Sequence, residues 1–350
     1  MSAPATWLPF RVPEGAVAAA PPEARGLDRD GVRRLVARPG RETHATARDL
    51  PAHLEPGDLL VVNTSATLPA AVDVTHRGRA TTVHVSTQLD GPGPSAGWVI
   101  EVRSPDGRGY DDVGAGEVLR LPGGQRLRVV EPHPAGQGRL WRAIPVPATP
   151  SVDYLTRHGH PIRYPYLDGA WPLEAFQNVY ADVPGSAEMP SAGRPLTEHL
   201  LVRLMARGVA VVPLVLHTGV ASQESAEPPQ PERFVVPEAT ARLVNSTRAV
   251  GRRVVAVGTT VVRALESCAG ATGTVTARTG WTDLVLDAAR PARVVDGLLT
   301  GLHEPEASHL HLLESVAGPP LVASAYAAAT EPLAPTYLWH EFGDVMLLLP

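Results

Sequence analysis

The sequence predicts an α/β layered domain into which a small all-β domain, a barrel or a sandwich, is inserted. Two changes of pattern along the chain indicate this organisation. Toward both ends, apolar runs of strand length alternate with stretches that have helical spacing. Between about residues 66 and 150, only short alternating runs occur, and Gly- and Pro-rich turns such as "DGPGPSAG" separate them. We therefore expect both ends of the chain to build one discontinuous domain around the inserted segment.

Before the inserted segment, residues 28–36 have a helical pattern, and "EPGDLLVVNTS" predicts a turn followed by a strand at 59–63. The inserted segment shows no helical periodicity of useful length. It supplies five or six strands, from the runs "AAVDVTH", "TTVHVSTQL", "GWVIEVRS", "EVLRLPG", "QRLRVVEP" and "RLWRAIPV". Short strands with Gly and Pro punctuation are typical of a small β-barrel or sandwich.

After residue 150, strand and helix patterns alternate again. We expect a helix at 197–208 that is capped by Thr197, a buried strand in "GVAVVPLVLHTG" and a helix at 237–250. The segment "GRRVVAVGTTVVRALES" predicts a strand at 253–257 and a helix after it. Later strands are expected in "TDLVL", "ARVVDGLLT" and "GDVMLLLP", and a surface loop in "ASQESAEPPQPE".

The composition excludes several classes of protein. Apolar residues make up 44% of the chain and the mean hydropathy is −0.03, which is typical of a globular protein. All 31 basic residues are arginine, so a Schiff-base lysine and the lysine of a phosphate-binding P-loop are excluded. Cys268 is the single cysteine, which excludes an intramolecular disulfide and a multi-cysteine zinc site.

We expect neither a signal peptide nor a membrane-spanning helix in this sequence. Its first residues lack a basic region and are interrupted by prolines, and no apolar run approaches the roughly 20 residues that a membrane helix needs. We therefore expect a cytoplasmic protein with no membrane partner. The net charge of −5 argues against a large basic surface, so nucleic-acid binding would depend on a local arginine patch.

The first candidate site is the junction between the predicted strand of "RVVAV" and the next helix. Gly258, Thr259 and Thr260 would place free N–H groups of a helix N-terminus at the end of a strand, where an anion or a polar ligand can bind. The alternative is that the threonines only cap the helix. Arg263 and Glu266 lie three residues apart on one face of this helix, and the alternative for them is a surface ion pair.

Other strand ends supply further candidates. His217 ends the buried strand of "VLHTG", where α/β proteins place ligand-binding residues, although a structural histidine is the alternative. Asp344 precedes the last strand, and the alternative for it is a turn residue. His303 belongs to "LHEPEASHLH", whose spacing does not bring metal ligands to one side of a helix, so we predict no metal site. The turn at Gly258 also lacks the G-x-G-x-x-G spacing of a dinucleotide-binding fold.

Taken in order, a series of motifs resembles the S-adenosylmethionine:tRNA ribosyltransferase-isomerase family of queuosine biosynthesis. The resemblance covers nearly the whole chain and rests on "PPEARG", "LPAHLEPGDLLVVNTS", "GHPIRYPY", "FQNVYADVPGSAEMPSAG", "LVLHTGV", "VVAVGTTVVRALES", "GWTDLVL", "RVVDGLLTGLHEPEASHLHLLESVAG" and "FGDVMLLL". It implies an α/β/α layered domain, formed by residues 1–65 and 151–350, with a small β-barrel inserted at 66–150.

The resemblance also implies a reaction with S-adenosylmethionine as substrate and tRNA as partner, without a metal or a redox cofactor. The ribosyl part of S-adenosylmethionine would pass to the aminomethyl group of a 7-deazaguanine in the anticodon and isomerise to an epoxycyclopentanediol. Adenine and methionine would leave. Such chemistry needs a base that removes the C5′ proton beside the sulfonium and an acid that helps adenine to depart.

The site residues that we expect from the matching motifs divide into two groups. The catalytic candidates are His217, His303 and Asp344. The candidates for binding S-adenosylmethionine are Thr259, Thr260, Arg263, Glu266, Trp281 and Asp283. Within the second group, we expect Arg263 to contact the methionine carboxylate and Glu266 to hold the guanidinium in place.

Some motifs of the family are altered in this chain. Asn63-Thr64-Ser65-Ala66 stands where the family usually has Asn-Asp-Thr-Arg, and "PPQPERF" replaces a Glu-His-x-Met-His-x-Glu block. Two alternatives to the tRNA enzyme therefore stay open. One is a related enzyme that uses S-adenosylmethionine on a small-molecule acceptor, and the other is a catalytically inactive binding protein on the same scaffold. We expect a monomer or a weak homo-oligomer.

Overall fold

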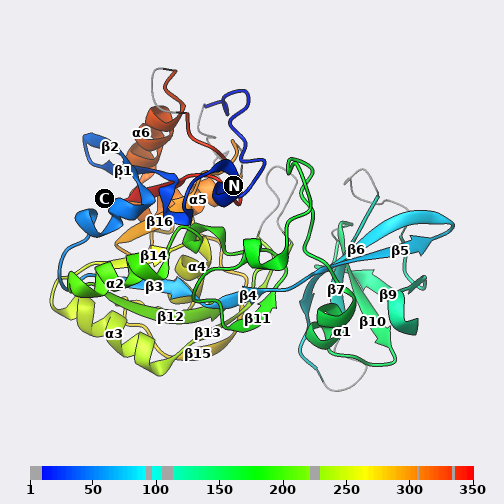
Figure 1. Ribbon diagram of the computed structural model, residues 1–350. Helices are drawn as coiled ribbons and strands as arrows, with labels where there is room; N and C mark the ends of the chain where they lie inside the picture. Colours follow the sequence, from blue (N-terminus) through cyan, green and yellow to red (C-terminus); the bar gives the residue numbers. More distant parts are fainter. Residues whose placement is uncertain are drawn as a thin grey trace.

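The computed structural model describes residues 10–91, 97–104, 113–136, 138–220, 229–305, 307–332 and 336–350. Most of the expected surface loop "ASQESAEPPQPE" lies outside the described residues. Figure 1 shows a large layered part that contains both chain ends and a separate β-rich part, with β4 and β11 between them. The α/β fold class with an inserted barrel is confirmed.

In the described chain, nine strands form one mixed sheet in the order β15-β13-β12-β3-β14-β16-β17-β1-β2. Their bounds are β1 Arg33–Arg38, β2 Arg41–Thr46, β3 Leu59–Asn63, β12 Ala210–Leu216, β13 Glu232–Val236, β14 Val254–Val257, β15 Arg278–Thr282, β16 Gly297–Gly301 and β17 Val345–Leu348. The central neighbours β12, β3, β14 and β16 run parallel, so their carboxyl ends meet at one edge. β17 is antiparallel to β16, and its amino end therefore lies at the same edge.

Helices cover both faces of this sheet. On one face lie α3 Glu238–Ala249, α4 Thr259–Ser267, α5 His309–Ala317 and α6 Pro319–Thr330. The other face is covered by α2 Glu198–Ala206 and the 3-10 helix η3 Ala47–His53. Leu59 and Val61 of β3 pack toward the first layer, while Leu60 and Val62 pack toward the second. Burial on both faces explains why the central strands are continuous apolar runs.

The β-rich part is a six-stranded antiparallel sheet in the order β5-β6-β7-β10-β9-β8, counted over the described residues. Its strands are β5 Ala71–His76, β6 Arg79–Gln88, β7 Trp98–Arg103, β8 Val118–Arg120, β9 Arg126–Pro132 and β10 Leu140–Val146. The sheet curls into a nearly closed barrel, and α1 Ser151–His158 packs Tyr154 and Leu155 into its core. The alternating runs of the sequence thus become strands that share one interior.

A short parallel pair connects the two parts. β4 Ser65–Thr67 continues from β3 toward the barrel, and it pairs with β11 Val183–Ser186 from the returning chain. The end of β3, β4 and β11 consequently lie together beside the carboxyl edge of the large sheet.

Two predicted elements are wrong. Residues 28–36 form a short 3-10 turn, η2 Arg29–Gly31, and the start of β1 rather than a helix, because β1 pairs with the remote strand β17. The strand expected in "TDLVL" ends at Thr282, since β15 pairs along β13 before that segment. The helix after Thr197 is confirmed, and the Thr197 hydroxyl accepts a 3.2 Å hydrogen bond from the Leu200 amide. Within the described ranges, no helix is long and apolar enough to cross a membrane.

Candidate functional site

The carboxyl edge of the large sheet gathers polar residues from four neighbouring strands. Asn63 ends β3, His217 follows β12, Gly258 follows β14, and His303 follows β16 by two residues. In open α/β sheets, ligands bind outside such carboxyl ends. The sheet edge at which the sequence predicted the site therefore exists.

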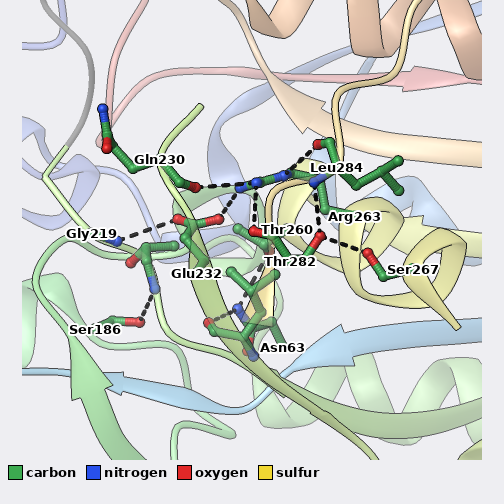
Figure 2. Close-up of polar contacts among 12 residues, drawn as sticks. Asn63, Ser186, Gly219, Gln230, Glu232, Thr260, Arg263, Ser267, Thr282 and Leu284 are labelled. Atoms are coloured by element: carbon green, nitrogen blue, oxygen red, sulfur yellow. Dashed lines mark hydrogen bonds and ion pairs between the residues drawn. The ribbon is translucent and has the colours of Figure 1, made fainter. Parts of the chain in front are cut away.

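Asn63 joins three elements at this edge. Its Nδ2 donates to the Leu216 carbonyl at 2.8 Å and to Thr260 Oγ1 at 3.3 Å. Its Oδ1 accepts hydrogen bonds from the amides of Leu216 at 2.9 Å and Ser65 at 3.1 Å. The buried amide thus fixes β12, β4 and the first turn of α4 relative to one another (Figure 2).

The turn before α4 is built on a glycine. Gly258 is the N-cap residue of the helix and has φ +91°, a left-handed conformation that favours glycine. No side chain caps this helix in the described chain, so the alternative that the threonines cap it is wrong. Thr259 and Thr260 lie half-buried in the first turn, where the backbone N–H groups point out of the helix.

His217 sits beside two buried serines. Its Nδ1 lies 2.7 Å from Ser65 Oγ, which lies 2.6 Å from Ser186 Oγ. A Cβ on Gly185 would come within 2.3 Å of His217 Nδ1, so this residue must be glycine for the ring to fit. Burial, together with the charge of Arg233, lowers the pKa of His217 to about 4. The imidazole is therefore neutral at pH 7.

Arg263 is engaged through all three of its guanidinium nitrogens. Figure 2 shows the Arg263 side chain beside Glu232, with whose carboxylate it forms an ion pair. Its remaining partners are the carbonyls of Leu284 at 3.2 Å, Gln230 at 3.2 Å and Thr282 at 3.1 Å. Since these contacts use all three guanidinium nitrogens, the role of Arg263 is to hold neighbouring protein segments in place rather than to contact a ligand.

The expected pairing of Arg263 with Glu266 does not form. The Glu266 carboxylate instead accepts three backbone hydrogen bonds, from the amides of Arg293 at 2.9 Å, Val294 at 2.8 Å and Val295 at 3.2 Å. Glu266 thus anchors the chain before β16. The partner of Arg263, Glu232, accepts a 3.3 Å hydrogen bond from the Gly219 amide, so Arg263 acts on the segment that follows His217.

Trp281 and Asp283 differ in their surroundings. Trp281 Nε1 donates a 2.7 Å hydrogen bond to Asp90 Oδ2, which lies just beyond β6 of the barrel. Asp90 also forms a 3.4 Å ion pair with Arg233, so one carboxylate links the edge strand β15 and its neighbour β13 to the barrel. The Asp283 side chain is exposed, and the structure does not bring it to this group.

His303 and Asp344 lie at the part of the edge formed by β16 and β17. His303 Nε2 lies 3.0 Å from Thr300 Oγ1, and burial lowers the pKa of His303 well below its ordinary value. Asp344 is buried, and its two oxygens accept hydrogen bonds from the amides of Arg33 at 2.7 Å and Leu338 at 2.8 Å. Its geometry is that of a structural residue that ties β1 to the turn before β17.

A cavity of about 200 Å³ opens between the barrel and the carboxyl edge. From the layered side it is lined by His217, Gly185 and Arg233, and from the barrel side by Ser86, Thr87, Gln88 and Asp90. Thr259, Thr260 and Arg263 are outside this lining. A second cavity of about 150 Å³ lies farther along β6, and its polar lining residues include Asp73, His84, Arg103, His160 and Glu188.

Sequence reasoning missed Asp90 and Arg233, which line the first cavity, and Ser65 and Ser186, which are hydrogen-bonded in series to His217. Ser65 and Ser186 lie in the motifs "VVNTS" and "DVPGSAEM", where a serine beside Asn63 and a serine beside Gly185 were the available signals. Asp90 and Arg233 carry no local signal, because they meet only when the barrel docks on the sheet. Among the described residues, no cluster of His, Cys, Asp and Glu side chains could hold a metal ion.

Comparisons with known proteins agree with this architecture. A family model described as "Queuosine biosynthesis protein" matches residues 6–348. An S-adenosylmethionine:tRNA ribosyltransferase-isomerase of Sorangium cellulosum is 34% identical over 370 residues, which cover 97% of each chain. The enzyme of the same name from Moorella thermoacetica is 34% identical over 349 residues, which cover 97% of this chain and 98% of the relative. The crystal structure of an S-adenosylmethionine tRNA ribosyltransferase from Thermotoga maritima is similar over 98% of this chain and 99% of its own, with 26% identity and a TM-score of 0.53.

Proposed function

Because the chain belongs to the queuosine biosynthesis protein family, we propose that it is an S-adenosylmethionine:tRNA ribosyltransferase-isomerase that acts in the cytoplasm. Its acceptor is the aminomethyl group of a 7-deazaguanine in the tRNA anticodon. One observation supports the proposal most directly: the cavity between barrel and sheet is lined by a neutral histidine and by a pair of opposite charges. The pair of charges suits the amino-acid end of S-adenosylmethionine, and the histidine suits its nucleoside end.

The amino-acid end of S-adenosylmethionine fits Arg233 and Asp90. Their side chains are 45% and 57% exposed at the mouth of the cavity, so they remain accessible to a ligand. A guanidinium and a carboxylate complement the carboxylate and the ammonium of an α-amino acid. We assign the carboxylate contact to Arg233 because the nitrogens of Arg263 are engaged with protein groups. Arg263 has the supporting role of holding the segment behind His217.

The nucleoside end then extends toward the carboxyl edge of the sheet. The N–H groups at the start of α4, beside Thr259 and Thr260, suit a ribose oxygen. His217 lines the cavity and is the proposed catalytic group in contact with the reacting centre, while His303 at the end of β16 is the second candidate. Glu266 and Asp344 have structural roles in this proposal, because their carboxylates accept hydrogen bonds from backbone amides.

The proposal is tested by incubating the protein with S-adenosylmethionine and tRNA that carries 7-aminomethyl-7-deazaguanine, with adenine and the modified nucleoside measured by chromatography. We expect adenine release that depends on this tRNA. Release without tRNA would support an enzyme with a small-molecule acceptor instead. Binding of S-adenosylmethionine without release under either condition would support an inactive binding protein. The His217→Gln variant shows whether any release arises from this site.

A further inference from the structure

Three polar side chains form a continuous hydrogen-bonded chain that ends at the cavity. Ser186 ends β11, Ser65 begins β4, and His217 follows β12, so three separate strands supply them. The distances are 2.6 Å between the serine oxygens and 2.7 Å from Ser65 Oγ to His217 Nδ1. Both serines are at most 1% exposed, and the histidine ring lines the cavity. Water therefore has little access to the serines, whereas a ligand can reach the ring.

The hydrogen-bond partners decide where the protons of this chain lie. The Thr218 amide donates to Ser186 Oγ at 3.0 Å, so this oxygen already accepts one hydrogen bond. If Ser186 donates to Ser65 and Ser65 donates to His217 Nδ1, both hydroxyl protons have an acceptor. If the direction is reversed, Nδ1–H donates to Ser65 and Ser65 to Ser186, and the Ser186 proton has no acceptor among the partners that the described chain provides. A buried donor without an acceptor is costly, so the first direction is favoured.

The ring is also held in one orientation. A Cβ on Gly185 would lie 2.3 Å from His217 Nδ1 and 2.4 Å from Cε1, which means that the backbone of β11 lies directly against this side of the imidazole. Nδ1 faces Ser65, so the opposite nitrogen, Nε2, is the one that remains for a ligand in the cavity. The carbonyl of Arg233 accepts the His217 amide at 2.9 Å and fixes the backbone at the same residue.

We propose that Ser65 and Ser186 are positioning residues that hold neutral His217 with its proton on Nε2, so that the cavity offers a hydrogen-bond donor to the substrate. The inference rests on the proposed function for the identity of that substrate. A donor at this point suits a ring nitrogen of the adenine that departs, where electron density increases as the glycosidic bond breaks. The proton stays on His217 during this contact, and the bare Nδ1 stays bonded to Ser65.

The test is the tautomer of His217, read from the ¹⁵N shifts of imidazole-labelled protein, with the His217 signals assigned by their loss in His217→Gln. We expect a protonated Nε2 and a bare Nδ1 at pH 7. In Ser65→Ala the preference for this tautomer should be lost, and in Ser65→Thr, which keeps a hydroxyl, it should be restored. Ser246→Ala, on the exposed face of α3, is the matched control and should leave the shifts unchanged. A protonated Nδ1 in the native protein, or unchanged shifts in Ser65→Ala, would overturn the proposal.

Activity gives a second, separate readout. Ser65→Ala and Ser186→Ala should lower kcat for adenine release by about 10- to 100-fold, less than the ~10²–10⁴-fold that a full acid–base group contributes, with KM for S-adenosylmethionine nearly unchanged. Circular dichroism and a thermal unfolding curve identify any variant that fails to fold. If an alanine variant does not fold, kcat and the tautomer are compared between Ser65→Thr and the native protein instead. If the tautomer is as expected but no acceptor leads to adenine release, the proposed function fails while the positioning role stands. If the enzyme is active with the proton on Nδ1, the positioning role fails while the function stands.

Discussion

The guanidinium of Arg263 and the carboxylate of Glu232 form an ion pair that is buried between α4 and β13, with side-chain exposures of only 7% and 14%. The same carboxylate accepts the Gly219 amide at 3.3 Å. This ion pair therefore connects α4 to the segment that follows His217. Burial raises the pKa of Glu232, and the charge of Arg263 opposes this rise.

Arg263→Ala should strongly destabilise the protein. The substitution leaves Glu232 buried without its partner and frees three carbonyls, and removal of one member of a buried pair costs roughly 3–5 kcal/mol. Urea unfolding measures the loss. Arg242→Ala, which removes an exposed pair with Glu238, is the control and should change the free energy of unfolding by less than about 0.5 kcal/mol. Equal losses in the two variants would contradict a buried role for Arg263.

Arg233→Ala should weaken binding of S-adenosylmethionine while leaving the fold stable. Loss of a charged hydrogen bond to the methionine carboxylate is worth roughly 1.5–3 kcal/mol, which corresponds to about a 10- to 150-fold rise in Kd. Isothermal titration calorimetry measures the change, with Arg242→Ala again as the exposed control. An unchanged Kd would remove Arg233 from the proposed binding site.

Glu101 in the barrel should make stability depend on pH. Burial would raise the pKa of this carboxyl, but hydrogen bonds from His84, Arg103 and Arg139 outweigh it and lower the pKa from 4.5 to about 2. Because the folded-state pKa is the lower one, the carboxylate stabilises the fold above about pH 4.5, and this contribution is lost as the pH falls toward 2. Glu101→Gln should thus be less stable than the native protein at pH 7.

The difference between Glu101→Gln and the native protein should shrink steadily below about pH 5, as measured by urea unfolding at a series of pH values. Glu238→Gln is a matched control, because its side chain is 75% exposed, and it should show no comparable trend. A difference that stays constant between pH 7 and about pH 3 would show that the charge of Glu101 is not what stabilises the barrel.

Asp344→Asn should lower the thermal stability because an amide group replaces one of two oxygens that accept backbone hydrogen bonds. The NH₂ group would face either the Arg33 or the Leu338 amide, and an unmatched buried donor costs roughly 1–3 kcal/mol. Differential scanning calorimetry gives the shift in Tm. A variant with native Tm and no adenine release would instead make Asp344 a catalytic residue.

The thiol of Cys268 should be unreactive in the native protein. The side chain is buried, and burial raises its pKa to about 11, so very little thiolate is present at pH 8. A chromogenic disulfide reagent should react slowly with the native protein and stoichiometrically after addition of denaturant. Rapid reaction without denaturant would show that α4 opens locally.

The sequence by itself determined the elements whose pattern is local. The apolar runs of β3, β12 and β14 are long enough to predict buried strands, and the alternation between residues 71 and 146 predicts the strands of the barrel. The carboxyl ends of those strands also indicated where His217 and Thr260 would gather, because parallel neighbours end at a common edge. Motif order along the chain indicated the family.

Only the tertiary structure decided which polar groups pair. Arg263 and Glu266 are neighbours on one helix, yet they do not pair. Each is buried, so each needs a partner that offsets the loss of its hydration. Arg263 binds the carboxylate of Glu232 on β13, and Glu266 accepts hydrogen bonds from three backbone amides. Likewise, residues 28–36 have a helical pattern, but pairing with β17, the last strand along the chain, draws residues from Arg33 onward into β1. Partners that are remote in the sequence leave no trace in local spacing, so the contacts of Ser65 with Ser186 and His217 appear only once three strands have been brought to one edge.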